Sequence, residues 1–176
     1  IDAQYALRVS CNYFFYELAS RCTWQMLDET AKGFGLGEPT GIELTEITGY
    51  RSNPDSKKAN HTGVDAAWGA GDRVLTGIGQ AENRFTPLQL AVYACTLANQ
   101  GTRYKATFLN RVASSDYRTL VYENQPEILS QMDISNDCYQ TYLEGMRAVA
   151  SLPGGTASNY FGGVKDAPGR NYPVTV

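Results

Sequence analysis

One segment, residues 86–101, constrains the fold of this chain more than any other, because it carries both the start and the stop signal of a helix. Thr86 can cap the helix, Pro87 suits the first helical position, and Gln89 completes a capping box. Gly101 is suited to ending it. The polar side chains form one stripe on an otherwise apolar surface, namely Gln89, Tyr93, Thr96 and Gln100. We therefore predict a helix to about Gln100 that is mostly buried and belongs to the core.

Three further helices are expected from the spacing of apolar residues. They run through about residue 9, from residue 13 to 32, and from residue 136 to 150, with Gly33 and Pro153-Gly154-Gly155 ending the last two. The expected core face of the second helix is Phe15, Leu18, Ala19, Cys22 and Met26. That of the third is Tyr139, Tyr142, Leu143, Met146, Val149 and Ala150.

Strand patterns come late in the chain. Residues 106–112 and 119–123 predict an antiparallel hairpin around the polar turn Ser114-Ser115-Asp116. The glycine-rich residues 34–49 predict a short strand or extended loop near Ile42 and Leu44, and residues 50–72 predict a long surface loop. No βαβ alternation or internal repeat is present, so the pattern indicates an α+β fold.

Composition excludes several classes of partner. The length of 176 residues suits one domain, and 15 basic and 18 acidic residues are mixed along the chain, so no charge pattern favours nucleic acid or anionic lipid. Apolar runs are far shorter than the roughly 20 residues of a membrane-spanning helix, and Ile1 does not begin a signal peptide. Four scattered cysteines and one histidine predict neither a metal site nor a disulfide framework.

Ser10-Cys11-Asn12 interrupts the helical pattern near the start of the chain. A tight loop at this point can direct a hydroxyl and a carboxamide toward the same space. Spacing alone favours a simpler interpretation, in which Ser10 and Asn12 cap the following helix.

The surrounding residues make that motif more specific. Residues 6–16, ALRVSCNYFFY, resemble the second active-site motif of class B penicillin-binding proteins, in which an Ala-Leu pair precedes Ser-x-Asn and an aromatic-rich helix follows. Further segments resemble the same family in the same order: Gly33-Phe34-Gly35 with Thr40-Gly41-Ile42-Glu43-Leu44, Gly77-Ile78-Gly79-Gln80, Thr86-Pro87-Leu88-Gln89-Leu90-Ala91, Ala98-Asn99-Gln100-Gly101, and Gly145-Met146-Arg147-Ala148-Val149 with Gly155-Thr156-Ala157.

The resemblance implies the penicillin-binding and serine β-lactamase-like transpeptidase fold, here mainly its helical part with some strands of an antiparallel sheet. That family builds its site from Ser-x-x-Lys, Ser-x-Asn and Lys-Thr-Gly or Lys-Ser-Gly. No serine of this sequence precedes a lysine by three residues, and no lysine is followed by Thr-Gly or Ser-Gly. We therefore expect residues 1–176 to be a partial transpeptidase domain, cut at both ends, with residues 172–176 opening a further strand.

The implied activity is that of a peptidoglycan D,D-transpeptidase, which cross-links stem peptides through a serine acyl-enzyme and is acylated by β-lactams. By the resemblance, Ser10 relays a proton between the catalytic lysine and the leaving nitrogen, and Asn12 binds the substrate's peptide group. Neither a metal nor a cofactor is implied. The parent protein is expected to be anchored in the bacterial membrane, with its catalytic domain on the extracytoplasmic face among cell-wall synthesis partners. This segment alone is expected to be inactive.

Other functions fit parts of the same pattern. A penicillin-recognising sensor, a serine β-lactamase or D,D-carboxypeptidase on this fold, and a non-catalytic interaction domain stay open. Cys11 with His61 as a thiol and base, and Glu43 with Glu46 as a glycosidase carboxylate pair, are both weaker hypotheses. Gly77-Ile78-Gly79-Gln80 lacks the lysine of a phosphate-binding loop and is better interpreted as a tight turn.

Overall fold

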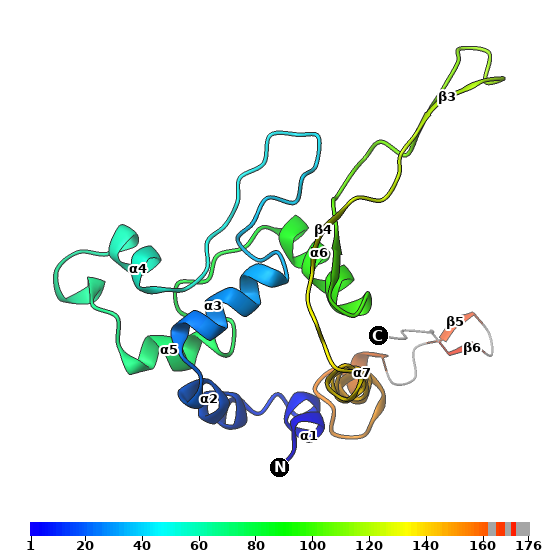
Figure 1. Ribbon diagram of the computed structural model, residues 1–176. Helices are drawn as coiled ribbons and strands as arrows, with labels where there is room; N and C mark the ends of the chain where they lie inside the picture. Colours follow the sequence, from blue (N-terminus) through cyan, green and yellow to red (C-terminus); the bar gives the residue numbers. More distant parts are fainter. Residues whose placement is uncertain (162–164, 168–169, 172–176) are drawn as a thin grey trace. The chain divides into compact units, whose positions relative to one another are not determined.

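The computed structural model describes residues 1–161, 165–167 and 170–171, and the chain divides into two compact units (Figure 1). Unit 1 comprises Ile1–Thr23, Gly69–Gln80 and Ile134–Val176, and unit 2 comprises Trp24–Trp68 and Ala81–Asp133. The strand expected at residues 172–176 lies outside the described residues.

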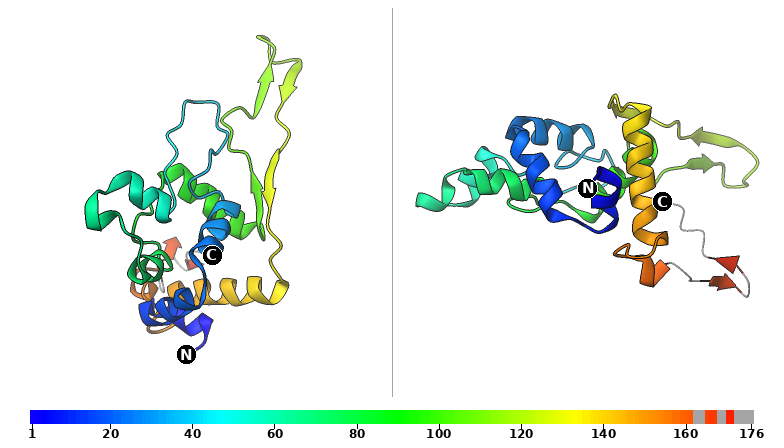
Figure 2. Two further views of the ribbon diagram at one scale, coloured as in Figure 1. Left: turned by 60° about the vertical axis from the view of Figure 1, so that its left-hand side comes forward. Right: turned by 90° about the horizontal axis from the view of Figure 1, so that it is seen from below.

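Two helices from opposite ends of the sequence pack together in unit 1. Helix α1 (Ala3–Arg8) lies against α7 (Asn136–Ser151), as two views show (Figures 1 and 2). A glycine permits the close contact, since a Cβ atom on Gly145 would lie 2.6 Å from Cδ1 of Leu7. The predicted apolar face of α7 is confirmed, because each of its residues is half-buried or buried. The short α8 (Ser158–Phe161) follows.

The predicted single helix over residues 13–32 is wrong. The structure has α2 (Asn12–Arg21) and α3 (Trp24–Gly33), separated at Cys22, whose backbone is extended with ψ 155°. Cysteine and threonine are weak helix formers, and Thr23 occupies the position before α3 where threonine is preferred. The expected continuous apolar face is therefore not formed, and Leu18 and Met26 are 50% and 54% exposed.

The predicted surface loop over residues 50–72 is also wrong. This stretch contains α4 (Pro54–Asn60), the 3₁₀ helix η1 (Gly63–Ala66) and the start of α5 (Ala70–Thr76). Asn53 and Ser56 form a capping box, in which the Ser56 amide donates to Asn53 Oδ1 at 2.8 Å and the Asn53 amide to Ser56 Oγ at 3.0 Å. Pro54 occupies the first turn, as Pro87 does in the helix that was predicted.

Helix α6 (Pro87–Ala98) starts as its sequence predicts, with Thr86 and Gln89 forming the capping box. The predicted burial is wrong, however, because one side of the helix is exposed, and two residues of the polar stripe face inward. Gln89 and Thr96 are each 1% exposed and Val92 is 9% exposed. The exposed side is apolar and consists of Leu90, Ala91, Ala94, Cys95 and Ala98.

The described strands form antiparallel two-stranded sheets. The predicted hairpin is confirmed in part, as β2 (Arg111–Ala113) paired with β3 (Leu120–Glu123). Residues 106–110, which were expected to belong to its first strand, are not in a strand. It continues an unpredicted pair, β1 (Thr102–Tyr104) with β4 (Ile128–Gln131), and Figure 2 shows both pairs along one ribbon. A third pair joins β5 (Lys165–Ala167) to β6 (Arg170–Asn171). Ile42 and Leu44 lie in a loop. Helices together with these sheets confirm the α+β class.

Candidate active site

Ser10 occupies a strained turn between α1 and α2. Its φ angle is +52°, a left-handed conformation that costs a residue with a side chain roughly 1–2 kcal/mol. Two backbone hydrogen bonds hold the turn, from Ser10 N to Leu7 O at 3.1 Å and from Cys11 N to Ala6 O at 2.8 Å. Such strain persists where surrounding contacts determine the conformation, and it often marks functional sites.

The helix-capping interpretation of this motif is wrong. Helix α2 has Cys11 at its N-cap position and no side-chain capping hydrogen bond, and Asn12 is its first residue. The Ser10 hydroxyl lies instead 3.2 Å from Oγ1 of Thr156. Ser10 and Asn12 are both exposed. Their polar groups therefore lie at the surface of unit 1, close together in the chain, without serving the backbone of α2.

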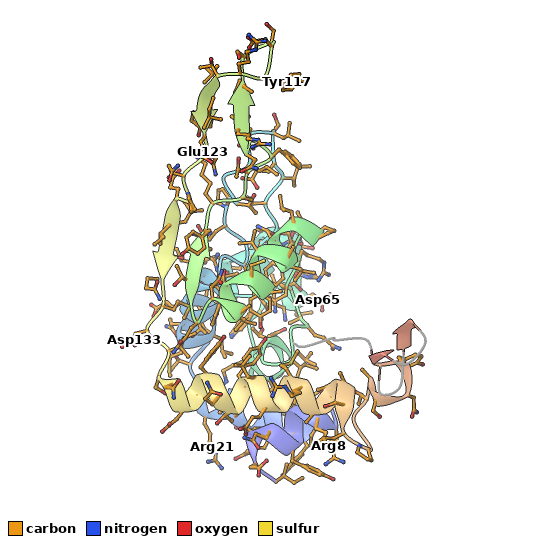
Figure 3. All side chains as sticks on the ribbon, turned by 90° about the vertical axis from the view of Figure 1, so that its right-hand side faces the viewer. Arg8, Arg21, Asp65, Tyr117, Glu123 and Asp133 are labelled. Carbon is orange, nitrogen blue, oxygen red and sulfur yellow. The ribbon has the colours of Figure 1, made fainter. Side chains whose placement is uncertain are left out.

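Hydrogen bonds join the turn that carries Thr156 to the end of α1. The Thr156 amide donates to Arg8 O at 3.1 Å, and Arg8 Nη2 donates to Pro153 O. The Ala157 amide donates to Val149 O at 3.1 Å, which ties the same turn to α7. Figure 3 shows Arg8 where α1 lies against α7. Residues 10 and 156 are thus brought together by the packing of these two helices.

The aromatic residues after Asn12 divide into two sets. Tyr13 is 78% exposed, next to the candidate site in sequence. Phe14 and Phe15 are half-buried and meet edge to face, with ring centroids 5.3 Å apart and an interplanar angle of 81°. The two phenylalanines therefore pack, whereas the Tyr13 ring lies at the surface.

The other candidate groups have local structural partners. His61 Nε2 lies 2.7 Å from Glu82 Oε1. Glu46 Oε2 accepts hydrogen bonds from the Thr40 hydroxyl and amide, at 2.7 and 3.0 Å. Glu43 accepts from the Thr107 hydroxyl and from the Phe108 amide. These carboxylates hold loop backbone in place.

Hydrogen bonding also sets the charge state of Glu43. The Thr107 hydroxyl and then the Phe108 amide lower the pKa of its carboxyl from 4.5 to about 2, because both bonds favour the ionised form. Glu43 is therefore a poor proton donor or acceptor near neutral pH. Within the described part of the chain, no three His, Cys, Asp or Glu side chains gather as a metal site would require.

Two surface cavities lie elsewhere. One of about 480 Å³ borders the hairpin and is lined by Glu43, Lys105 and Glu127 among others. The other, of about 440 Å³, lies between α1 and α7 and is lined by Tyr5, Arg8 and Glu144 among others. Neither of these two cavities is lined by Ser10 or Asn12. No helix among the described residues has the length and apolar character needed to cross a membrane.

The family model described as "Penicillin binding protein transpeptidase domain" matches residues 1–168. The chain belongs to the penicillin-binding protein transpeptidase family. Among its relatives in this family, the peptidoglycan D,D-transpeptidase MrdA of Escherichia coli is 30% identical over 156 residues, which cover 89% of this chain and 24% of that protein. Penicillin-binding protein 2A of Bacillus subtilis is 34% identical over 130 residues, 71% of this chain and 16% of that protein.

Solved structures of the family have the same fold. Penicillin-binding protein 2 of Helicobacter pylori superposes with a TM-score of 0.74 at 24% identity, over 94% of this chain and 29% of that one. Penicillin-binding protein 2B of Streptococcus pneumoniae superposes with a TM-score of 0.73 at 23% identity, over 93% of this chain and 28% of that one. These matches confirm the predicted fold, and the family model with the named relatives confirms the resemblance to penicillin-binding transpeptidases. The chain spans about a quarter of the length of the E. coli relative.

The sequence predicts Ser10 and Asn12 as site residues but gives no sign of the contact between Ser10 and Thr156. Gly155-Thr156-Ala157 was recognised as a family-like segment, without any indication that it meets Ser10. The two residues are 146 positions apart, so no local spacing could have paired them.

Proposed function

We propose that this chain is part of a peptidoglycan D,D-transpeptidase that cross-links stem peptides through a serine acyl-enzyme. Family membership and the printed names of the relatives support this activity. The observation that carries the roles of Ser10 and Asn12 is the strained, exposed turn between α1 and α2. Its hydroxyl and carboxamide are not used as helix caps.

In this proposal the nucleophilic serine and its lysine come from a Ser-x-x-Lys motif that the present sequence does not contain. The lysine takes the serine proton, the serine oxygen bonds to the carbonyl carbon of the penultimate D-alanine, and the bond to the terminal D-alanine breaks. Ser10 gives its proton to the leaving nitrogen and receives one from the lysine, so it begins and ends as a hydroxyl. The amine of a second stem peptide then takes the acyl group.

Asn12 would bind a peptide group of the stem peptide that donates the acyl group. A carboxamide offers both an acceptor and two donors, which is what recognition of a peptide N–H and C=O requires. β-Lactams would acylate the same serine, since their strained amide takes the place of the D-Ala-D-Ala bond. One structural neighbour is described as an imipenem acyl-enzyme complex, that of penicillin-binding protein A from Mycobacterium tuberculosis.

The cellular setting is part of the same proposal. A solved complex joins penicillin-binding protein 2 of H. pylori to MreC, and another neighbour belongs to a peptidoglycan synthase complex. By analogy, the whole protein would act at the extracytoplasmic face of the cell membrane, anchored there, with cell-wall synthesis partners. The names of its relatives favour a transpeptidase over a sensor or a β-lactamase.

The test uses the full-length protein that contains this segment and a fluorescent penicillin. Ser10→Ala should lower the acylation rate at least about tenfold, because a positioned proton-transfer group typically contributes more than that. Asn12→Ala should also lower the acylation rate, because the donor peptide loses the hydrogen bonds that position it. Both should change the free energy of unfolding by less than about 1 kcal/mol, since neither side chain caps α2. Ser20→Ala, an exposed serine on the same helix, is the matched control.

Equal losses of acylation rate and stability in Asn12→Ala would support the capping role and count against the substrate-binding one. Absence of any covalent label on the full-length wild-type protein would exclude the transpeptidase, the sensor and the β-lactamase together. A label that forms and is then rapidly hydrolysed would favour the β-lactamase.

A further inference from the structure

We infer that Thr156 is a positioning residue for Ser10, holding its hydroxyl in the orientation that proton relay requires. The inference rests on the proposed function of Ser10. The structural basis is the contact between the two hydroxyls, with Ser10 Oγ and Thr156 Oγ1 separated by 3.2 Å. Thr156 thereby becomes a fourth functional position on this fold, beside the three motifs expected from the sequence.

Ser10 needs such a partner because its backbone turn fixes the Cα–Cβ direction but not the hydroxyl. The left-handed φ of +52° and the hydrogen bonds at Ser10 N and Cys11 N determine the backbone. Ser10 is exposed, so packing does not select its rotamer. An exposed hydroxyl without a fixed partner samples several staggered positions, and a relay works from one of them.

Thr156 is suited to the task because two backbone hydrogen bonds fix the turn that carries it. Its amide donates to Arg8 O and the next amide donates to Val149 O, each at 3.1 Å. Its β-branched side chain has few χ1 alternatives. The preceding Gly155 is buried, and a Cβ there would lie 2.4 Å from Val149 O, so the turn lies directly on α7.

The chemistry favours Thr156 as the donor in this pair. A serine hydroxyl has one proton and two lone pairs. When Thr156 donates to one lone pair, the Ser10 proton stays free for the leaving nitrogen. As that proton departs, negative charge grows on Ser10 Oγ, and the Thr156 O–H bond points at it. Thr156 keeps its own proton throughout, so the balance of the proposed reaction is unchanged.

A purely structural role for the contact predicts different behaviour. Both side chains are exposed, so one hydrogen bond between them adds little to folding. A structural bond would affect stability and acylation together, whereas a positioning bond affects the acylation step and leaves penicillin binding intact. A positioning bond would also affect acylation only when Ser10 is present.

The experiment measures acylation of the full-length protein by a fluorescent penicillin, separating the binding constant from the acylation rate constant. Thr156→Val removes the hydroxyl at constant shape and should lower the rate constant about tenfold with little change in binding. Thr156→Ser keeps the hydroxyl and should retain most of the rate. Ser158→Ala, which removes a hydroxyl bonded to Gly155 O in the same turn, should match wild type.

A double mutant tests whether Thr156 acts through Ser10. Adding Thr156→Val to Ser10→Ala should cause no further loss, because the partner is already absent. A further loss as large as in the wild-type background would overturn the inference, as would a wild-type rate in Thr156→Val or an equal loss in Ser158→Ala. Thr156→Ala serves if the valine variant is poorly folded, as judged by its melting temperature.

The same series separates the two proposals. If Ser10→Ala acylates as fast as wild type, the proposed role of Ser10 is wrong and this inference is wrong with it. If Ser10→Ala is slow and Thr156→Val is fast, the role of Ser10 stands and only the positioning by Thr156 is rejected.

Discussion

Individual polar residues, more than large apolar ones, organise the interior of unit 2. Gln89 is 1% exposed and satisfies three backbone groups at once. Its Nε2 donates to Glu38 O at 2.9 Å, and its Oε1 accepts from the amides of Thr86 and Gly49 at 3.1 and 3.3 Å. A buried amide with its partners in place is tolerated, whereas losing it leaves several groups unpaired.

Glu43 carries a residue-scale prediction about pH. Its folded pKa of about 2 lies below the ordinary 4.5, so its ionised form stabilises the fold above pH 4.5. That contribution is lost as the pH falls from 4.5 to about 2. We expect Glu43→Gln to remove part of the acid dependence of the free energy of unfolding over this range, measured with urea at several pH values.

The matched control for this prediction is Glu29→Gln, at an exposed position on α3. It should keep the acid dependence of the wild type. An identical slope in wild type and Glu43→Gln would show that the hydrogen bonds from Thr107 and Phe108 do not depress the pKa as described.

At the scale of elements, a capping box followed by proline marks the start of two helices. The capping box and proline at Thr86 predicted α6, and the same arrangement at Asn53 and Pro54 begins α4. Helix α4 was missed because its seven residues include no large apolar side chain and so show no apolar periodicity. Short helices of this kind are identified by their caps alone.

Contact between α2 and α5 gives an element-scale prediction. Gly77 caps α5 with a helical φ of −63°, where alanine would ordinarily be accepted. A Cβ on Gly77 would, however, lie 2.4 Å from Cβ of Ala19, one of the buried residues of unit 1. Gly77→Ala should therefore lower the free energy of unfolding by about 1–3 kcal/mol, as overpacking does.

Two further variants check the cause. Ala19→Gly in the Gly77→Ala background should recover part of the loss, giving a favourable coupling energy in a double-mutant cycle. Gly71→Ala, on α5 with nothing within 4 Å of the added Cβ, should be neutral or stabilising. Equal destabilisation by both alanine substitutions would point to the backbone of α5 instead of the contact.

At the scale of the whole molecule, apolar groups lie at the surface on two of the described elements. Apolar groups are exposed on the outer side of α6 and along the hairpin, where Leu120 and Val121 are 53% and 66% exposed and Tyr117 marks the tip (Figure 3). Periodicity shows which side of a helix is apolar, but neighbouring elements decide which side is covered.

The lack of a Ser-x-x-Lys motif in this sequence leads to a prediction for the whole molecule. The 176-residue polypeptide alone should form no covalent adduct with a fluorescent penicillin, because its sequence contains no Ser-x-x-Lys. Gel fluorescence measures the adduct, and circular dichroism establishes that the polypeptide is folded. Labelling that disappears in Ser10→Ala would show that Ser10 is itself the nucleophile.

The sequence by itself determined the α+β class, the start of α6, the extent of α7, the β2–β3 hairpin and the family, because these depend on local signals in a fixed order. It also identified Ser10 and Asn12 as the candidate motif. Only the tertiary structure decided that Gln89 and Thr96 face inward and that Thr156 meets Ser10. Those outcomes depend on which elements pack together, and residues 146 positions apart share no local pattern.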